Sequence, residues 1–342
     1  MNPVWKMLED LGTKKGINEI VINGPKNIFV ERAGEFIGLN VGLTKNDLLG
    51  FIKDIADFNK KVCDHENPIM DGNLPDGSRV NVVLAPFTSD GAAITIRKYV
   101  RTNINLVEHS QSFGIQEKWV PFFQALVHSR RNILVSGGTG VGKTTFMNML
   151  LKEISPDQRI ISIEDTLELN ITNPNTVRLE AGSKLEGGET KITIRDLVKN
   201  TLRMRPDRII IGECRGGEVF DLLQAMNTGH EGSMTSIHSN SPVECLSRVE
   251  TLFMMAGFDI PYHVVRRHIS QAVDFVIQLG RGPGGRRVVQ QVLEINSLEG
   301  NNILTSSILE SIDGELTSTG VVPECMSELN TDGDLPRDFF NS

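Results

Sequence analysis

The glycine-rich segment GGTGVGKT, residues 137–144, places the strictest limit on how this 342-residue chain can fold. It fits the pattern GxxxxGK[ST], follows the β-branched run NILVS (132–136) and precedes a helical pattern that extends to about Glu153. In such a unit the glycines let backbone N–H groups converge on a phosphate, and the helix N-terminus adds positive field. Lys143 would reach the β- and γ-phosphates, and the Thr144 hydroxyl would bind Mg²⁺. The segment therefore predicts a phosphate-binding loop in an α/β domain.

Short apolar runs alternate with helical patterns in the part of the chain that follows residue 115. Strands are expected at 159–163, 208–212 and 234–238, and helices near 194–204, 218–227 and 243–255. Runs of β-branched residues separated by amphipathic helices indicate a mostly parallel sheet covered on both faces. The pattern weakens after Gly280.

The first hundred residues follow a different pattern, typical of a smaller α+β unit. A short helix is expected at 4–11, strands at 17–22, 27–32, 35–39, 79–85 and 92–98, and a helix after Thr44, where Asp47 completes a capping box. Residues 100–112 are polar and lose periodicity, and the last fifteen residues are polar and acidic. We therefore expect an N-terminal α+β domain (1–102), a linker (103–114), an α/β domain (115–327) and a flexible tail (328–342).

Composition excludes several classes of protein. The formal charge of −8 (35 basic against 43 acidic residues) argues against binding nucleic acid by charge, although Arg281, Arg286 and Arg287 form a local basic cluster. No apolar run approaches the 18 or so residues that span a bilayer, and the N-terminus lacks the pattern of a secretory signal. The four cysteines are far apart and lack zinc-ligand spacing, so a reduced, cytoplasmic chain is expected.

Acidic residues follow two of the predicted strands. Glu164, Asp165 and Glu168 come after the first, and Glu213 comes after the second, two residues before Arg215. The carboxyl ends of parallel strands meet at one edge of a sheet, which is where ligands bind in open α/β folds. Any one acid could be a surface charge, but two clusters beside a phosphate loop favour a site that holds a metal and a water.

A third polar segment, residues 228–238, carries a histidine near each end, His230 and His238. It could be a plain strand–helix turn. Neither histidine has cysteine or carboxylate partners at metal-ligand spacing, so zinc is not expected. A histidine at a strand's end could contact the γ-phosphate through a hydrogen bond.

The order of these motifs resembles that of the secretion and pilus ATPases, the motors of type II and type IV secretion and of type IV pili. GGTGVGKT is similar to their Walker A motif, EDTLE to the Asp box, IIIGECRGGE to Walker B and TGHEGSMTSIH to the His box. LRMRPDRIIIGECRGGE, EIVINGPKNIFVER and DGSRVNVV are similar to the CpaF/TadA branch, which drives tight-adherence (Flp) pili. The resemblance extends from about residue 10 to 295.

The resemblance implies a RecA-like P-loop NTPase domain with a mostly parallel sheet, preceded by a smaller α+β domain, with the nucleotide between them. It also implies a homohexamer that binds ATP and Mg²⁺. The partners would be inner-membrane platform proteins of a pilus or secretion machine, and the protein would be cytoplasmic and peripheral to that membrane. No nucleic acid is expected.

The resemblance also assigns residues. Glu168 would activate water, Glu213 would hold Mg²⁺ through water with Thr144, His238 would contact the γ-phosphate, and Lys143 and Arg97 would complete the catalytic set. The nucleotide-binding set would be Gly138, Thr139, Gly140, Val141, Gly142, Lys143, Thr144, Thr145, Arg101, Arg203, Arg215 and His230. Arg203, Arg205 and Arg208 match a basic stretch beside the site that could face a neighbouring subunit; for each arginine a surface ion pair is the alternative.

Three other functions stay open at this point. An ATPase of the same kind could act on a conjugation-type secretion channel rather than on a pilus. The chain could bind ATP as a scaffold without turnover, which the joint presence of Lys143, Glu168, Glu213 and His238 disfavours. A helicase is disfavoured by the net charge and by the lack of basic stretches interleaved with aromatic residues.

Overall fold

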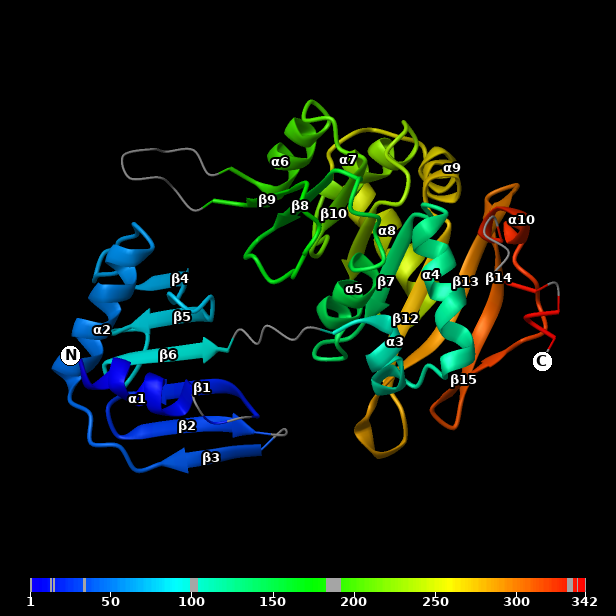
Figure 1. Ribbon diagram of the computed structural model, residues 1–342. Coiled ribbons are helices and arrows are strands. Elements are labelled where there is room, and N and C mark those ends of the chain that lie inside the picture. Colours follow the sequence, from blue (N-terminus) through cyan, green and yellow to red (C-terminus); the bar gives the residue numbers. More distant parts are fainter. Residues whose placement is uncertain are drawn as a thin grey trace. The chain divides into compact units, whose positions relative to one another are not determined.

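The computed structural model describes residues 2–12, 14, 16–32, 35–98, 104–182, 192–330, 335–336 and 338–341. These residues form two compact units, the first ending at residue 98 and the second beginning at residue 104 (Figure 1). Within the described part of the chain, no helix has the length and apolar content to cross a bilayer.

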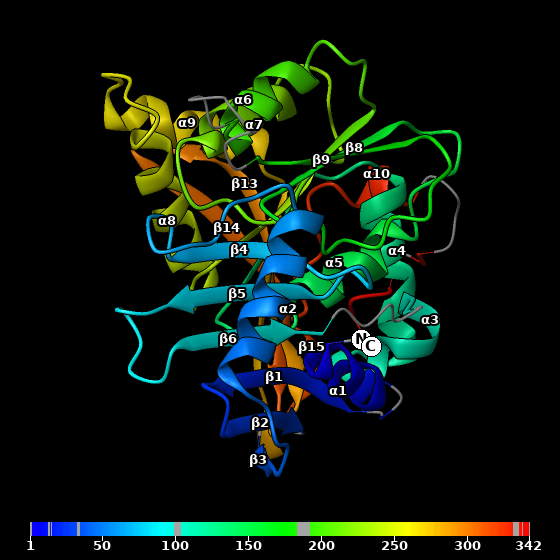
Figure 2. The same ribbon diagram turned by 90° about the vertical axis from the view of Figure 1, so that its left-hand side faces the viewer.

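Unit 1 is an antiparallel sheet with two helices on one face. Its described strands have the order β3-β2-β1-β6-β5-β4. Their bounds are β1 (Ile17–Asn23), β2 (Asn27–Arg32), β3 (Glu35–Leu39), β4 (Ile69–Asn73), β5 (Arg79–Leu84) and β6 (Ala92–Arg97). The helices α1 (Pro3–Gly12) and α2 (Lys45–Phe58) lie across this sheet (Figure 2).

Local sequence explains most of unit 1. The capping box is present, because Asp47 N–H donates to the Thr44 hydroxyl and the Asp47 carboxylate accepts from Thr44 N–H. Alternate residues of β5 are buried against the helices. Strand β4 was not predicted, since Asp71 and Gly72 are poor strand formers; it forms because β5 pairs with it.

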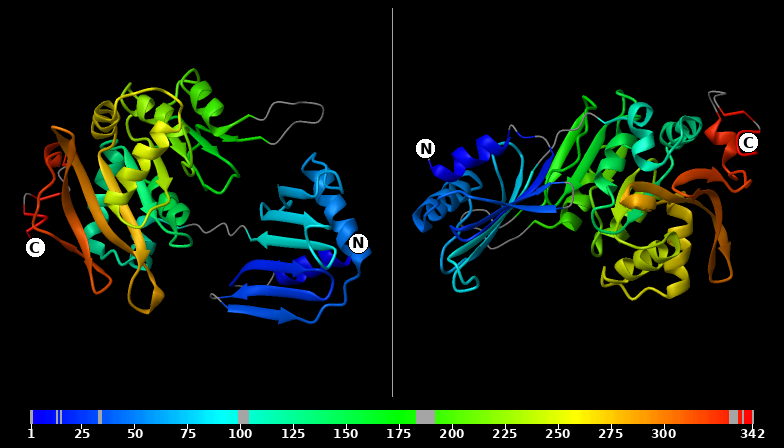
Figure 3. Two further views of the ribbon diagram at one scale, coloured as in Figure 1. Left: turned by 180° about the vertical axis from the view of Figure 1, so that it is seen from behind. Right: turned by 90° about the horizontal axis from the view of Figure 1, so that it is seen from below.

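Unit 2 contains a sheet whose described strands have the order β15-β14-β13-β12-β7-β11-β10-β8-β9. The strands from β12 to β9 are parallel to one another, and β12 to β15 continue the sheet as an antiparallel extension (Figure 3). Their bounds are β7 (Ile133–Gly137), β8 (Ile160–Glu164), β9 (Thr176–Glu180), β10 (Arg208–Ile211), β11 (Met234–Ile237), β12 (Phe275–Arg281), β13 (Arg287–Glu299), β14 (Asn302–Ile312) and β15 (Glu315–Ser318). The predicted fold class, a mostly parallel α/β domain after a smaller α+β domain, is confirmed.

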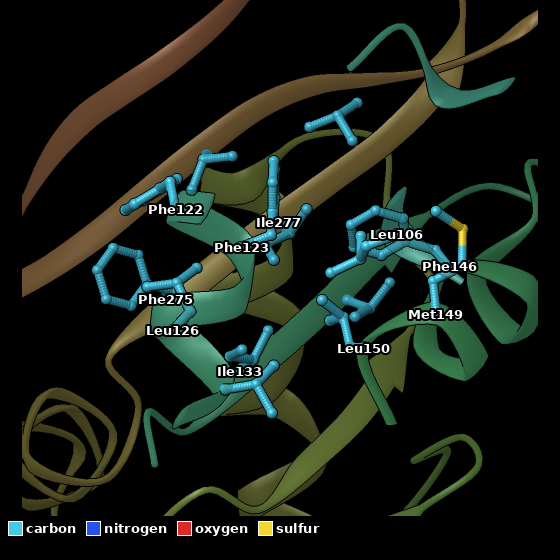
Figure 4. Close-up of a cluster of buried hydrophobic side chains, with 14 of the residues drawn as sticks. Leu106, Phe122, Phe123, Leu126, Ile133, Phe146, Met149, Leu150, Phe275 and Ile277 are labelled. Carbon is cyan, nitrogen blue, oxygen red and sulfur yellow. The ribbon is translucent and has the colours of Figure 1, made fainter. Parts of the chain in front are cut away.

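Helices cover both faces of this sheet. One face packs against α4 (Val120–His128) and α5 (Lys143–Leu151), as the close-up in Figure 4 shows. The other face carries α6 (Ile194–Thr201), α7 (Glu218–Met226), α8 (Pro242–Met254) and α9 (Tyr262–Ala272). The neighbours Ile133 and Leu134 of β7 are buried in the cores on opposite faces of the sheet, which explains why this strand is a continuous apolar run in the sequence.

Two segments of unit 2 differ from the expectations of a linker and a flexible tail. The expected linker contains α3 (Leu106–His109) and a 3-10 helix (Ser110–Phe113), and Leu106 and Phe113 are buried in the core. In the expected tail, α10 (Met326–Leu329) forms, and Leu329, Leu335 and Phe340 are buried. Single apolar residues, spaced too far apart to raise the average hydropathy, anchor both segments.

Candidate active site

The phosphate loop joins β7 to α5 and contains Gly138, Thr139, Gly140, Val141 and Gly142, with Thr144 and Thr145 in the first turn of α5. Gly142 has φ +97°, and a Cβ on it would lie 3.1 Å from Cζ of Phe113. Glycine is therefore required there for both backbone conformation and space. The helix N-terminus and the amides of the loop make a cradle for an anion.

Lys143 folds back over this loop. Its Nζ donates hydrogen bonds of 2.9 Å to the carbonyl oxygens of Gly137 and Gly138. Burial lowers the pKa of Lys143, while the nearby charge of Glu213 raises it and that of Arg215 lowers it. Lys143, Glu213 and Arg215 are thus close enough to interact electrostatically at the mouth of the loop.

The predicted carboxylates meet at the carboxyl edge of the sheet. The Thr144 hydroxyl lies 3.4 Å from Oε2 of Glu168, at the limit of a hydrogen bond. Arg215 donates from Nη2 to Oε2 of Glu213 at 2.6 Å, and its Nη1 lies 4.0 Å from Oδ2 of Asp165. The acids that follow β8 and β10 therefore share one edge with the phosphate loop, as parallel strands require.

The two histidines lie at opposite edges of the sheet. His238 directly follows β11, which lies between β7 and β10, and its side chain is exposed at the edge that carries the phosphate loop. His230 precedes β11, and its Nδ1 lies 3.2 Å from the carbonyl oxygen of Ala225. Within unit 2, His238 but not His230 lies on the side of the phosphate loop.

The basic stretch of Arg203, Arg205 and Arg208 lies where β10 begins, at the same edge of the sheet as His230. It is therefore not beside this chain's own phosphate loop. Arg203 and Arg205 are exposed there, and Arg203 donates to Oδ1 of Asn200 at 3.2 Å. Arg208 is fully buried and donates to the Val127 carbonyl oxygen (2.7 Å) and to Oε1 of Gln158 (2.5 Å). Burial, with a smaller contribution from Arg130, lowers the pKa of Arg208 to about 10. Arg208 is therefore a structural residue, neither the predicted site residue nor a surface ion pair.

The remaining predicted arginines belong elsewhere in the chain. Arg97 ends β6 of unit 1, where it is exposed and stands opposite Glu19 and Arg79 in the sheet. Arg101 lies outside the described residues.

Arg281 is a site residue that the sequence analysis placed only in a basic cluster. Its Nη2 donates to the carbonyl oxygen of Gly140 at 3.0 Å, and its Nη1 donates to that of Gly285 at 2.8 Å. Leu279 stands opposite Gly137, so the chain after β12 runs directly beside the phosphate loop. By holding the Gly140 carbonyl, Arg281 fixes the orientation of a peptide in the loop. The glycine-rich turn GRGPGGRR after a strand was the available signal.

The donor set fits a magnesium–nucleotide complex. Lys143 and the glycine amides would supply positive charge and N–H donors for phosphates, while Thr144 and Glu213 would supply the hard oxygen ligands that Mg²⁺ prefers, Glu213 through water. Among the described residues, and apart from its two chain neighbours, none has a heavy atom within 4 Å of the place of a Cβ on Gly138, which leaves space beside the loop.

Known proteins are similar to this chain in sequence and in fold. The family model described as "Type II/IV secretion system protein" matches residues 5–300. The chain is 35% identical over 291 residues to the conjugal transfer protein TrbB of Rhizobium radiobacter, covering 84% of this chain and 86% of TrbB. It is 33% identical over 309 residues to the type IV secretion system protein PtlH of Bordetella pertussis, covering 82% and 91%. The crystal structure of the pilus retraction motor PilT with bound ADP shares the fold, with a TM-score of 0.62 at 19% identity, covering 97% of this chain and 86% of PilT.

Proposed function

Because this chain belongs to the type II/IV secretion system protein family, we propose that it is a P-loop ATPase, a homohexameric motor that couples ATP hydrolysis to transport or pilus assembly on an inner-membrane platform. The observation that carries the proposal is the convergence of Lys143, Thr144, Glu168 and Glu213 at one edge of the sheet. A phosphoryl-transfer site needs those functions together: a phosphate cradle, a metal site and an acceptor for the proton of water.

Each residue has a separate role in the proposal. Lys143 stabilises charge that develops on the phosphates, which is an electrostatic contribution to the transition state. Thr144 and Glu213 would hold Mg²⁺, Glu213 through water, and bound Mg²⁺ would neutralise phosphate charge. Glu168 accepts a proton from the attacking water, and His238 contacts the γ-phosphate.

The basic residues complete the proposal. Arg215 is exposed beside Glu213 and would contact phosphate from within the same site. Arg203 and His230 lie at the opposite edge of the sheet, so a role at a nucleotide requires the site of a neighbouring copy in the ring. Arg97 and Arg101 are proposed from the family resemblance to act on the phosphates.

Steady-state phosphate release from Mg-ATP tests the proposal. We expect turnover that stops when EDTA removes Mg²⁺, and light scattering with a non-hydrolysable nucleotide should give a mass near that of six chains. ATP binding without turnover would support the scaffold alternative instead. A monomeric mass in all nucleotide states would contradict the ring.

The machine that this motor serves has two candidates. The motifs quoted above favour a tight-adherence pilus of the CpaF/TadA branch. The similarity to TrbB and PtlH favours a conjugation-type or type IV secretion channel as the second candidate. Stimulation of ATP hydrolysis by purified pilus platform protein would support the first candidate, and stimulation by channel protein alone would support the second.

A further inference from the structure

Glu164, the last residue of β8, differs from the neighbouring acids because its side chain is buried, with 3% exposed. Its Oε1 accepts hydrogen bonds from the backbone N–H groups of Glu168 and Leu169, both at 2.8 Å. A Cβ on Gly212, after β10, would lie 3.0 Å from Cγ of Glu164, so the two strand ends approach closely and a side chain at 212 would press on Glu164. This buried carboxylate fixes the turn through which the chain leaves β8.

Arg178 holds the same turn from the edge strand β9, where it stands opposite Ser162 of β8. Its Nη2 donates to the carbonyl oxygen of Leu169 at 2.7 Å and lies 3.7 Å from Oε2 of Glu164. The pKa of Glu164 is raised overall, because burial, with the charge of Glu168, outweighs the two backbone hydrogen bonds and the charge of Arg178, which lower it. Arg178 therefore favours the ionised carboxylate, which is the stronger hydrogen-bond acceptor.

We propose that Glu164 and Arg178 are a pair of positioning residues that set the place of the Glu168 carboxylate relative to Thr144. The proposal rests on the role given above to Glu168 as the acceptor of a proton from water. The backbone N–H of Glu168 donates to Glu164, which sets the place from which the Glu168 side chain extends, and its carboxylate then lies 3.4 Å from the Thr144 hydroxyl. A misplacement of about 1 Å at a reacting group can cost about 10²-fold in rate.

The pair acts through Glu168 and not on the nucleotide directly. Among the described contacts, Oε1 of Glu164 accepts hydrogen bonds from two backbone N–H groups, and Arg178 donates to a backbone carbonyl oxygen of the same turn. Because Oε1 of the buried Glu164 already accepts two backbone hydrogen bonds, the proposal gives Glu164 a positioning role and keeps Glu168 as the base.

The test compares Arg178→Gln and Arg178→Lys with a matched control, Arg266→Gln. Arg266 likewise pairs with a buried glutamate, Glu250, and donates to a backbone carbonyl, that of Asn301, but it does so on α9. Two readouts are needed: hydrogen exchange of the Glu168 and Leu169 amides, and kcat together with the affinity for a fluorescent ATP analogue.

In Arg178→Gln we expect both amides to exchange about ten-fold faster and kcat to fall about 10- to 100-fold, while the affinity for the analogue changes less than two-fold. Both contacts of Arg178 converge on one nitrogen atom, so the lysine ammonium should restore most of kcat. The control should change neither readout.

Unchanged amide exchange in Arg178→Gln would overturn the proposal, and so would an equal loss of kcat in Arg266→Gln or a failure of Arg178→Lys to rescue. A wild-type protein without turnover would overturn the proposed function instead. In that case the amide exchange would still decide whether the pair holds the turn.

Discussion

Replacing Phe340 by alanine removes a buried ring from a cluster near the end of the chain. Phe340 is 1% exposed, its ring lies 5.3 Å from that of Phe122 and 6.2 Å from that of Trp119, and its carbonyl oxygen accepts from the Ser318 hydroxyl. Phe122 lies on α4, and Trp119 Nε1 donates to the Leu316 carbonyl oxygen, so these two rings have little freedom to move into the space.

The expected cost follows from that burial. Phe→Ala changes in such cores cost about 3–5 kcal/mol, since the transfer free energy of the ring and the energy of the cavity add. For a unit of this size, each kcal/mol lowers the Tm by roughly 2–4 °C. Because the segment can undock as a whole, the free energy with which it docks sets the upper limit of the loss.

Urea unfolding followed by tryptophan fluorescence measures this loss. The chain has two tryptophans, and Trp5→Phe removes the one in unit 1, so that Trp119 reports on unit 2 alone. Val243→Ala is the control, because Val243 is apolar, lies in the same unit and is 68% exposed. A loss below about 1 kcal/mol in Phe340→Ala, equal to that of the control, would refute the docking of this segment.

Three further substitutions test the site. Lys143→Ala should lower kcat by about 10²–10³-fold with the Tm unchanged, measured by phosphate release and thermal unfolding, and wild-type turnover would remove the phosphate-loop assignment. Arg281→Ala should free the Gly140 carbonyl and weaken ATP binding about ten-fold, measured by titration with a fluorescent analogue, and unchanged affinity would contradict the role of Arg281. Arg97→Ala should reduce kcat strongly, with partial rescue by Arg97→Lys because an ammonium lacks the planar fork; a wild-type rate would point to Arg101.

The sequence was informative wherever structure is set by neighbouring residues. The glycine-rich turn between β7 and α5, the capping box at Thr44 and the apolar strands β7, β8 and β10 all depend on short-range patterns, and they occur where they were predicted. Because β8 and β10 are parallel, their carboxyl ends lie at the same edge of the sheet, and Glu168 and Glu213, which follow them, lie there too.

The features that the sequence did not predict depend on partners far along the chain. Strand β13 carries a buried glutamate, Glu294, whose carboxylate accepts from the backbone N–H groups of Glu324 and Cys325. From the sequence alone, a charged residue inside a strand is predicted to be exposed, because the distant donors that satisfy it are not known. In the same way, Arg208 can be buried because it donates to the Val127 carbonyl oxygen and to Gln158. The motif that contains Arg208 predicts neither contact.

We propose above that Glu168 activates water for hydrolysis of ATP held by the phosphate loop. The most direct test measures phosphate release and binding of a fluorescent ATP analogue in Glu168→Gln beside the wild type. An amide cannot accept the proton from water, so Glu168→Gln should bind the analogue as tightly as the wild type and release phosphate at least about 10²-fold more slowly. Hydrolysis at the wild-type rate by Glu168→Gln would contradict this proposal.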